Sequence, residues 1–157
     1  MTSDDADWLD PDELTAWINL IKLASRIVTL SDGEFRRTRS ITGRDYELLH
    51  HVSSSDNGWR INELADLIDD SSSCITHRVN RLHEAGLVHK RSDPDDLRAR
   101  RVKLTTAGRN LLAQTAPEHV ARVREWVIDP LDHAELIELG RLAGVLNVHL
   151  RTVAPPT

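Results

Sequence analysis

The chain has 157 residues, of which 39% are hydrophobic and 29% charged, a composition typical of a soluble globular protein with one core-bearing domain. No apolar run approaches the roughly 18 residues that a membrane-spanning helix needs, and the acidic start, MTSDDADWLD, is unlike a signal peptide. We therefore expect a cytoplasmic protein without a membrane partner, and the single cysteine, Cys74, excludes an internal disulfide framework.

The charge of the chain is unevenly distributed. The net charge of −5 by itself argues against a nucleic-acid partner. Residues 76–103, however, carry eight basic and four acidic side chains, a local charge of +4 that leaves −9 for the rest of the chain. A basic segment in an acidic chain is typical of a phosphate-contacting surface, although an ordinary solvated face has the same composition.

The first predicted element is a helix over residues 10–40. Asp10 is a good N-cap, Pro11 takes the favoured first position, and Glu13 has the spacing of a capping box. Gly33 weakens the prediction of helix beyond that point. Apolar residues recur every three or four positions, so we expect one face to be buried: Leu14, Trp17, Ile18, Ile21, Ala24 and Val28.

The middle of the chain predicts helices followed by a hairpin. After a helix over residues 42–52 and the loop SSSDNG, Asn62 can cap a short helix, and Ser71 can cap the next, which we expect to end before Gly86. The runs LVHKR and RRVKLT are typical of two strands. The residues expected to face the core are Ile75, Val79, Leu82, Val102 and Leu104. This order of elements predicts a winged helix-turn-helix over residues 42–104.

Two further helices complete the single predicted unit. Thr105 can cap a long helix to about residue 128, bent or interrupted at Pro117, and a last helix spans about residues 132–151. Apolar residues cover more than one face of the last helix: Leu136, Ile137, Leu139, Leu142, Ala143, Leu146 and Leu150. Because one small domain offers too little cover for them, we expect a homodimer, with residues 10–40 and 105–151 as dimerisation helices.

The helix that follows Ser71 has a second face made of hydrogen-bonding side chains. Its members recur at helical spacing: Ser73, Thr76, His77 and Asn80. Such side chains suit a helix in the major groove, where base edges present donors and acceptors. A solvated helix face looks the same, but its position directly before a basic hairpin favours DNA. Arg78 and Arg81 flank this face, and we expect them to reach phosphates.

The predicted hairpin is basic on both strands. Lys90 and Arg91 precede its turn, and the basic residues that follow the turn are Arg98, Arg100, Arg101 and Lys103. A basic hairpin can lie along the DNA backbone and insert a tip arginine into the minor groove. We assign this role to Arg98, with Asp96 close enough to orient it. A charged, exposed hairpin without a partner is the alternative.

These residues carry a family resemblance. Residues 63–108 contain the run ELA, a helix that ends in Leu-x-x-x-Gly-Leu-Val, the wing sequence D-x-R and the closing LT-x-x-G. This segment resembles the core of the MarR family, and the match extends over about residues 42–115. The resemblance implies a mainly α dimer with a small β wing, whose terminal helices interleave, and which binds a pseudo-palindromic operator, usually as a repressor.

By position, the resemblance also assigns residue roles. Residues 72–81, from Ser72 to Arg81, correspond to the recognition helix, Arg98 to the wing-tip arginine and Asp96 to its partner. Leu97 departs from the Lys or Arg of many relatives, which is expected to weaken the wing's phosphate contacts. Relatives bind small aromatic acids in a cleft beside the dimer helices, where Trp17 or Tyr46 could line the site. Both residues suit a core equally well.

Other functions have weaker support in the sequence. The eight histidines show no metal-ligand spacing, so we expect no metal, and Cys74 suits packing better than redox sensing. No nucleophile elbow, phosphate-binding glycine loop or apolar carboxylate pair is present, so we expect neither an enzyme nor a cofactor. The main alternative is a winged helix that binds protein without DNA affinity, and the basic wing argues against it.

Overall fold

The computed structural model describes residues 8–39, 41–93 and 100–154, with the backbone alone for residues 37–39. Contacts divide the chain into two compact units, Met1–Gly43 and Arg44–Thr157. The predicted wing tip, with Asp96, Leu97 and Arg98, lies outside the described residues. The assignment of dimerisation helices and a DNA-binding lobe stays a prediction.

The first unit is formed by α1, Pro11–Arg39. The predicted capping box is confirmed. The Asp10 carboxylate accepts the backbone N–H groups of Asp12 and Glu13 at 2.8 and 2.9 Å, and the Glu13 carboxylate accepts that of Asp10 at 2.9 Å. The helix continues through Gly33 without a break, because one interior glycine costs only about 1 kcal/mol.

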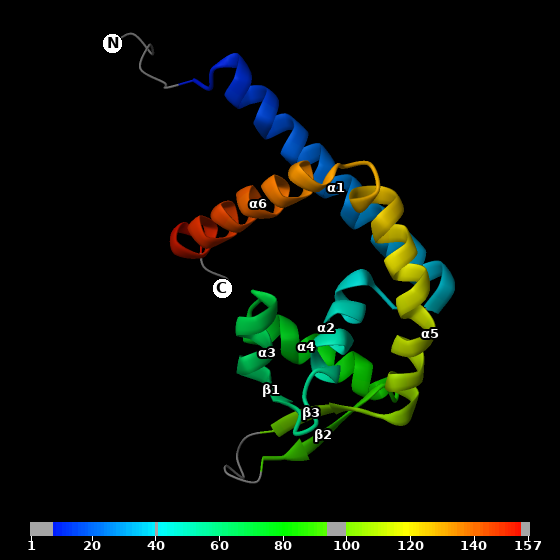
Figure 1. The fold of residues 1–157 in the computed structure, drawn as a ribbon. Coiled ribbons are helices and arrows are strands. Elements are labelled where there is room, and N and C mark those ends of the chain that lie inside the picture. Colours follow the sequence, from blue (N-terminus) through cyan, green and yellow to red (C-terminus); the bar gives the residue numbers. More distant parts are fainter. Residues whose placement is uncertain (1–7, 40, 94–99, 155–157) are drawn as a thin grey trace. The chain divides into compact units, whose positions relative to one another are not determined.

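The second unit contains the winged helix and the C-terminal helices (Figure 1). Its elements are α2 (Gly43–Ser53), β1 (Trp59–Arg60), α3 (Ile61–Ile68), α4 (Ser72–Glu84), β2 (Val88–Ser92), β3 (Arg100–Leu104), α5 (Thr106–Val123), a π-helical segment (Arg124–Ile128) and α6 (His133–Val153). The strands form an antiparallel sheet in the order β1-β3-β2. Val88 lies opposite Leu104, and Trp59 lies opposite Val102. The predicted fold class, mainly α with a small β wing, is confirmed.

The core of this unit is built from α2, α3, α4, β2 and β3. The residues predicted to face the core are at most 4% exposed: Ile75, Val79, Leu82, Val102 and Leu104. Further buried apolar residues include Leu48 and Leu49 of α2, Leu64 of α3 and Val88 of β2. Burial on one face of α4 leaves its other face in solvent.

The limits of α4 agree with the prediction. The Ser71 hydroxyl accepts the Cys74 N–H at 3.2 Å, which caps the first turn. At the other end Gly86 has a φ of 72°, a left-handed conformation that favours glycine, and the Leu87 N–H reaches back to the Leu82 carbonyl at 2.9 Å. The chain therefore turns directly from α4 into β2.

The start of α3 differs from the prediction. Asn62 is not its cap, because Arg60 takes that position and the Glu63 carboxylate accepts the Arg60 N–H at 2.7 Å. The reason is β1, which pairs with β3 and leads directly into the helix. A strand of two residues is too short to show an alternating pattern in the sequence.

The long C-terminal helices begin as predicted. Thr105 caps α5 by accepting the Gly108 N–H at 3.0 Å, and Asp132 caps α6. Pro117 does not interrupt α5, which runs through it to Val123 and continues as the π-helical segment. None of the residues of α6 is buried.

A close approach joins the first turn of α5 to the segment before β2. A Cβ atom on Gly108 would lie 2.1 Å from the carbonyl oxygen of Leu87. The Thr105 hydroxyl donates to the Gly86 carbonyl at 2.7 Å in the same place. Only glycine fits at position 108, and the contact holds α5 against the sheet.

Gly108→Ala is expected to lower the free energy of unfolding by about 2 kcal/mol or more, because the added methyl group must push α5 away from Leu87. The control is Ala107→Gly at the exposed neighbouring position, where the loss of helix propensity costs about 1 kcal/mol. Urea unfolding measures both variants. A Gly108→Ala protein as stable as the wild type would contradict the contact.

Candidate nucleic-acid interface

Helix α4, the predicted recognition helix, is held in place by an ion pair to the turn that precedes it. The Arg78 guanidinium donates to the Asp70 carboxylate at 2.5 Å, and Arg44 of α2 contacts the same carboxylate oxygen at 3.4 Å. Burial alone would raise the pKa of the Asp70 carboxyl, but the Ser71 N–H and the Arg78 charge outweigh it and hold that pKa below its ordinary value. Asp70 is therefore a charged anchor at the turn between α3 and α4.

A second ion pair holds α4 about one turn further along the helix. Arg81 pairs with Asp45, a carboxylate on α2 that is 2% exposed. The two pairs, made by arginines on successive turns of α4, limit the rotation of the helix about its axis. The face that points to solvent is thereby fixed as well.

The solvent-exposed face of α4 contains the predicted hydrogen-bonding side chains. Ser72, Ser73, Thr76, His77 and Asn80 are all exposed. The Thr76 hydroxyl donates to the Ser72 carbonyl at 2.7 Å, which limits its rotation. We call the set of Ser73, Thr76, His77 and Asn80 the polar face.

Lys90 connects this face to the wing. Its ammonium group, on β2, donates to the side-chain oxygen of Asn80. A cation thus lies beside a predicted base-reading residue. Arg91 follows Lys90 on β2, Arg100 lies opposite Ser92 on β3, and both arginines are exposed. Arg100 donates to the Ser92 hydroxyl at 2.6 Å.

The two arginines of α4 have different surroundings. The side chain of Arg81 is 49% exposed, so its outer edge remains accessible beside the polar face. The side chain of Arg78 is only 11% exposed and is paired with Asp70. This placement does not suit the predicted phosphate contact, because a buried, paired guanidinium would have to leave its carboxylate to reach DNA. In this structure Arg78 contacts Asp70, and its phosphate contact stays a prediction.

Comparison with known proteins identifies this arrangement. A family model described as a winged helix DNA-binding domain matches residues 41–108. The crystal structure of Sco3205, a MarR family transcriptional regulator from Streptomyces coelicolor in complex with DNA, is 30% identical to this chain. The similarity covers 91% of this chain and 94% of Sco3205, with a TM-score of 0.88. The chain belongs to the MarR family of transcriptional regulators.

Other relatives are also regulators. AbsC, a MarR family transcriptional regulator from Streptomyces coelicolor, is 29% identical with a TM-score of 0.88, over 94% of this chain and 99% of AbsC. The transcriptional regulator PecS of Dickeya dadantii is 24% identical over 136 residues, which cover 83% of this chain and 81% of PecS. As a MarR family member, the chain is a transcriptional regulator with a winged helix DNA-binding domain.

The MarR wing of this chain is anchored by a carboxylate that no pattern in the sequence singles out. Asp93 is fully buried at the end of β2. It accepts the Arg60 Nε at 2.6 Å and the Arg101 Nε at 2.8 Å on the same oxygen. Arg101 also donates to the Gly58 carbonyl at 3.0 Å. These contacts tie β1 and β3 to the end of β2, and they assign Arg101 to structure.

The two predicted effector-binding residues lie in different units. Trp17 is on α1 and is 55% exposed. Tyr46 is buried on α2, where its ring centroid lies 4.7 Å from that of His119, and burial raises the pKa of its hydroxyl. Neither residue's role in ligand binding is tested by this placement, so both stay predictions.

The described residues offer neither a metal site nor a membrane-spanning helix. Across residues 8–39, 41–93 and 100–154, no three His, Cys, Asp or Glu side chains are grouped so that they could hold a metal ion. No helix in this part of the chain is both long and apolar enough to span a bilayer.

Asp93→Ala is expected to lower the free energy of unfolding by about 2 to 3 kcal/mol, because it leaves two partly buried guanidinium groups without their carboxylate. The control is Asp66→Ala, which removes an exposed carboxylate from α3. Chemical denaturation compares the two. If both variants lost the same small amount, Asp93 would not anchor the wing.

Proposed function

We propose that this chain is a homodimeric repressor that reads a pseudo-palindromic operator with α4 and is released from it by a small ligand. The observation that carries the DNA-reading part is the fixed, exposed polar face of α4 beside the cations of β2. Uncharged donors and acceptors on a helix suit base edges, while lysine and arginine next to them suit phosphates.

The roles of the described residues follow from exposure and partners. We assign base reading to Ser73, Thr76, His77 and Asn80, with Ser72 at the first turn. Phosphate contacts go to Lys90, Arg91 and Arg100 on the wing strands and to the exposed edge of Arg81. Asp96 and Arg98, outside the described residues, remain assigned to the wing tip through the family resemblance.

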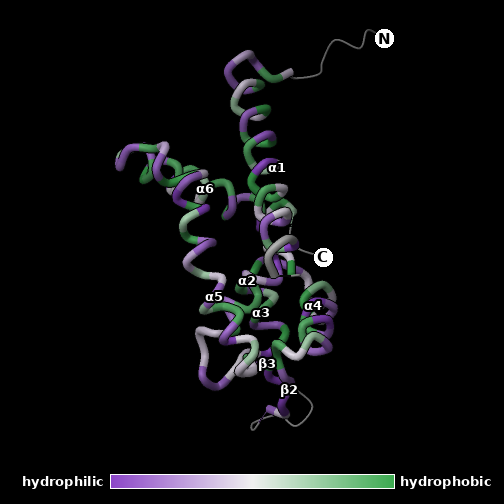
Figure 2. The backbone as a smooth tube through the Cα atoms, turned by 90° about the vertical axis from the view of Figure 1, so that its right-hand side faces the viewer, coloured by the Kyte–Doolittle hydropathy of each residue, from purple (hydrophilic) through white to green (hydrophobic). Residues whose placement is uncertain are grey.

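The dimer is supported by the surface of the terminal helices. No residue of α6 is buried, yet it presents large apolar side chains that are 37% to 68% exposed: Ile137, Leu139, Leu142, Val145, Leu146, Val148, Leu150 and Val153. Figure 2 shows hydrophobic stretches along α6 and along α1. On α1 the predicted buried stripe is also exposed, with Trp17 at 55% and Val28 at 58%. A second subunit would bury these surfaces.

Repression and ligand release rest on a simple physical argument. A dimer bound across an operator excludes other proteins from that DNA, and a ligand that prefers the unbound conformation lowers the operator affinity by its differential binding. A winged helix that binds only protein is the competing function, and it predicts no dependence on DNA sequence.

Asn80→Ala is expected to weaken binding to the best operator by about 1 to 3 kcal/mol and binding to random DNA far less, because its amide reads a base edge. The matched control is Asn62→Ala, which truncates an exposed asparagine on α3. Fluorescence anisotropy at one fixed salt concentration measures both, with an operator selected from a random duplex library. Equal losses on both DNAs would move base reading away from α4.

The dimer is tested separately by sedimentation velocity. The wild type is expected to sediment only as a dimer at micromolar concentration, with an interface of about 2,000 Å² or more. Leu142→Asp should produce monomer or unfolded chain, because it puts a charge into that interface. Leu67→Asp changes an equally exposed leucine on α3 and should leave the dimer intact. A well-folded wild-type monomer would overturn the proposal.

A further inference from the structure

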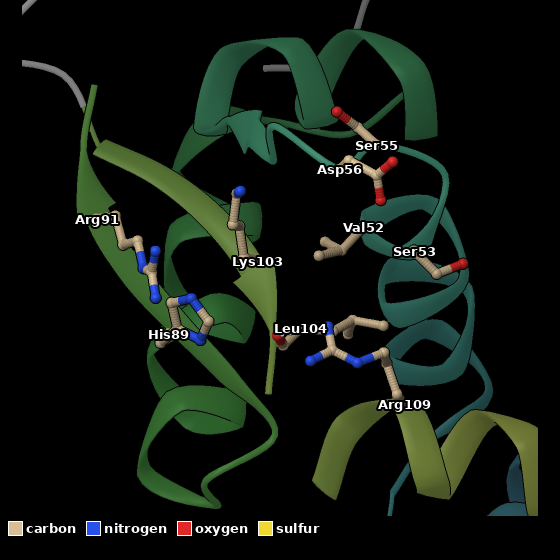
Figure 3. Close-up of a pocket in the computed structure, with 9 residues that line it drawn as sticks. All are labelled: Val52, Ser53, Ser55, Asp56, His89, Arg91, Lys103, Leu104 and Arg109. Atoms are coloured by element: carbon tan, nitrogen blue, oxygen red, sulfur yellow. Dashed lines mark hydrogen bonds between the residues drawn. The ribbon is translucent and has the colours of Figure 1, made fainter. Parts of the chain in front are cut away.

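A pocket of about 280 Å³ lies on the second unit, and α4 contributes none of its lining residues (Figure 3). It is formed by the end of α2 and the loop that follows, by β2 and β3, and by the first turn of α5. Its charged and titratable lining residues are His89, Arg91, Lys103, Arg109 and Asp56. The pocket therefore carries three permanent positive charges and a histidine against one carboxylate.

The positive groups are held together by the fold. His89 and Lys103 are direct cross-strand neighbours on β2 and β3, so their side chains lie on the same face of the sheet. Arg109 is brought to the same place by the contact between Gly108 and Leu87. Within residues 8–39, 41–93 and 100–154, no carboxylate forms an ion pair with Arg91, Lys103 or Arg109. Among the described residues that line the pocket, Asp56 is the one carboxylate.

The loop after α2 closes the pocket over Lys103. A Cβ atom on Gly58, whose φ is 76°, would lie 2.7 Å from the Cγ atom of Lys103 and 2.6 Å from the Val102 carbonyl oxygen. The absence of a side chain at position 58 thus lets the loop pack directly on β3. Lys103 is half-buried as a result, and its stem is held in place.

His89 adds an unsatisfied hydrogen-bonding group. Its Nε2 atom is buried and has no hydrogen-bond partner among the described residues. Burial lowers the pKa of the imidazole below its ordinary value, and the charges of Arg91, Lys103, Arg109 and His83 lower it further. Asp56 of the loop is the opposing charge in the pocket lining. A buried polar atom without a partner is costly, and a bound anion would supply an acceptor for a protonated Nε2.

We propose that this pocket binds a small anion, the carboxylate or the phosphate- or sulfate-like group of an effector, between the wing strands and the first turn of α5. The volume suits one anionic group with a small body attached. This proposal assigns a binding site to the proposed ligand response. It rests on the proposed function only for the effect of the bound anion on DNA binding. Anion binding itself is measured without DNA.

A bound anion changes both the protonation and the charge of the wing. By stabilising the imidazolium it raises the pKa of His89, so a proton is taken up on binding at a pH between the free and bound pKa values. It also neutralises charge beside Arg91, one of the proposed phosphate-contacting residues. The anion therefore weakens the attraction between the wing and DNA. A ligand that releases the protein from its operator must have this effect.

The test is titration of the full chain, free of DNA, with sulfate and with benzoate, both of which keep their charge above about pH 5. Calorimetry in two buffers of different ionisation enthalpy measures proton uptake, and NMR follows the His89 imidazole. We expect a raised His89 pKa and net proton uptake. Lys103→Met should weaken binding at least about tenfold, and His89→Gln should abolish the proton uptake.

The matched control is Lys90→Met. It removes one cation next to His89 on β2, at a position that does not line the pocket. It should weaken anion binding by less than about twofold. Equal losses in Lys103→Met and Lys90→Met, an unchanged His89 pKa, or no binding up to about 10 mM would overturn the proposal.

A DNA arm separates this proposal from the function on which it partly rests. At equal ionic strength, benzoate in place of chloride should lower operator affinity for the wild type but not for Lys103→Met. If benzoate bound the pocket and the protein bound no DNA, the proposed function would fail while the anion site stood. If benzoate lowered operator affinity equally in both proteins, release through this pocket would be wrong. If a phosphate of the DNA backbone were the natural occupant of the pocket, benzoate and random DNA would compete for binding.

Discussion

The interface depends on the ion pairs that fix α4, Arg78 with Asp70 and Arg81 with Asp45. Each pair joins a guanidinium on α4 to a carboxylate on a neighbouring segment, so together they set the rotation of the helix. They also engage the two arginines closest to the polar face. In the proposed function, base reading is therefore left to uncharged polar side chains, whose hydrogen bonds depend on position more than on charge. The same proposal gives phosphate contacts mainly to the wing strands.

The same division of charge recurs in the wing. Arg60 and Arg101 are held by the buried carboxylate of Asp93, which makes them structural. Lys90, Arg91 and Arg100 on the strands are exposed, and Lys103 with Arg109 faces the basic pocket. Of a basic segment that looks uniform in the sequence, part stabilises the fold, part suits DNA and part suits a small anion. The acidic remainder of the chain opposes adsorption at random, so affinity for DNA has to come from this one surface.

Local signals in the sequence predicted most of the fold, because capping boxes, apolar spacing and terminal glycines act within a few residues. The caps at Asp10, Ser71 and Thr105 and the inward residues of α4 are examples. The ion pairs could not be predicted from the sequence, because their partners lie far apart in the chain. Asp93 meets Arg60 across 33 residues, and Arg81 meets Asp45 across 36. The pairing of Arg78 with Asp70 could not be predicted for the same reason, since nothing in the helical position of Arg78 points to this partly buried carboxylate. The strand β1 was missed because two residues carry no pattern.

The central claim, that α4 lies in the major groove with its polar face toward the bases, can be tested through Cys74, the only cysteine of the chain. Cys74 is exposed on α4 beside that face, so an iron chelate attached to it would cleave the nearest DNA backbone. On a selected operator, the account predicts two symmetric clusters of cleavage about 34 Å apart, one from each subunit. The same chelate on an Ala134→Cys, Cys74→Ser chain, which places it on α6, should cleave little. Uniform cleavage from Cys74, or stronger cleavage from position 134, would contradict the account.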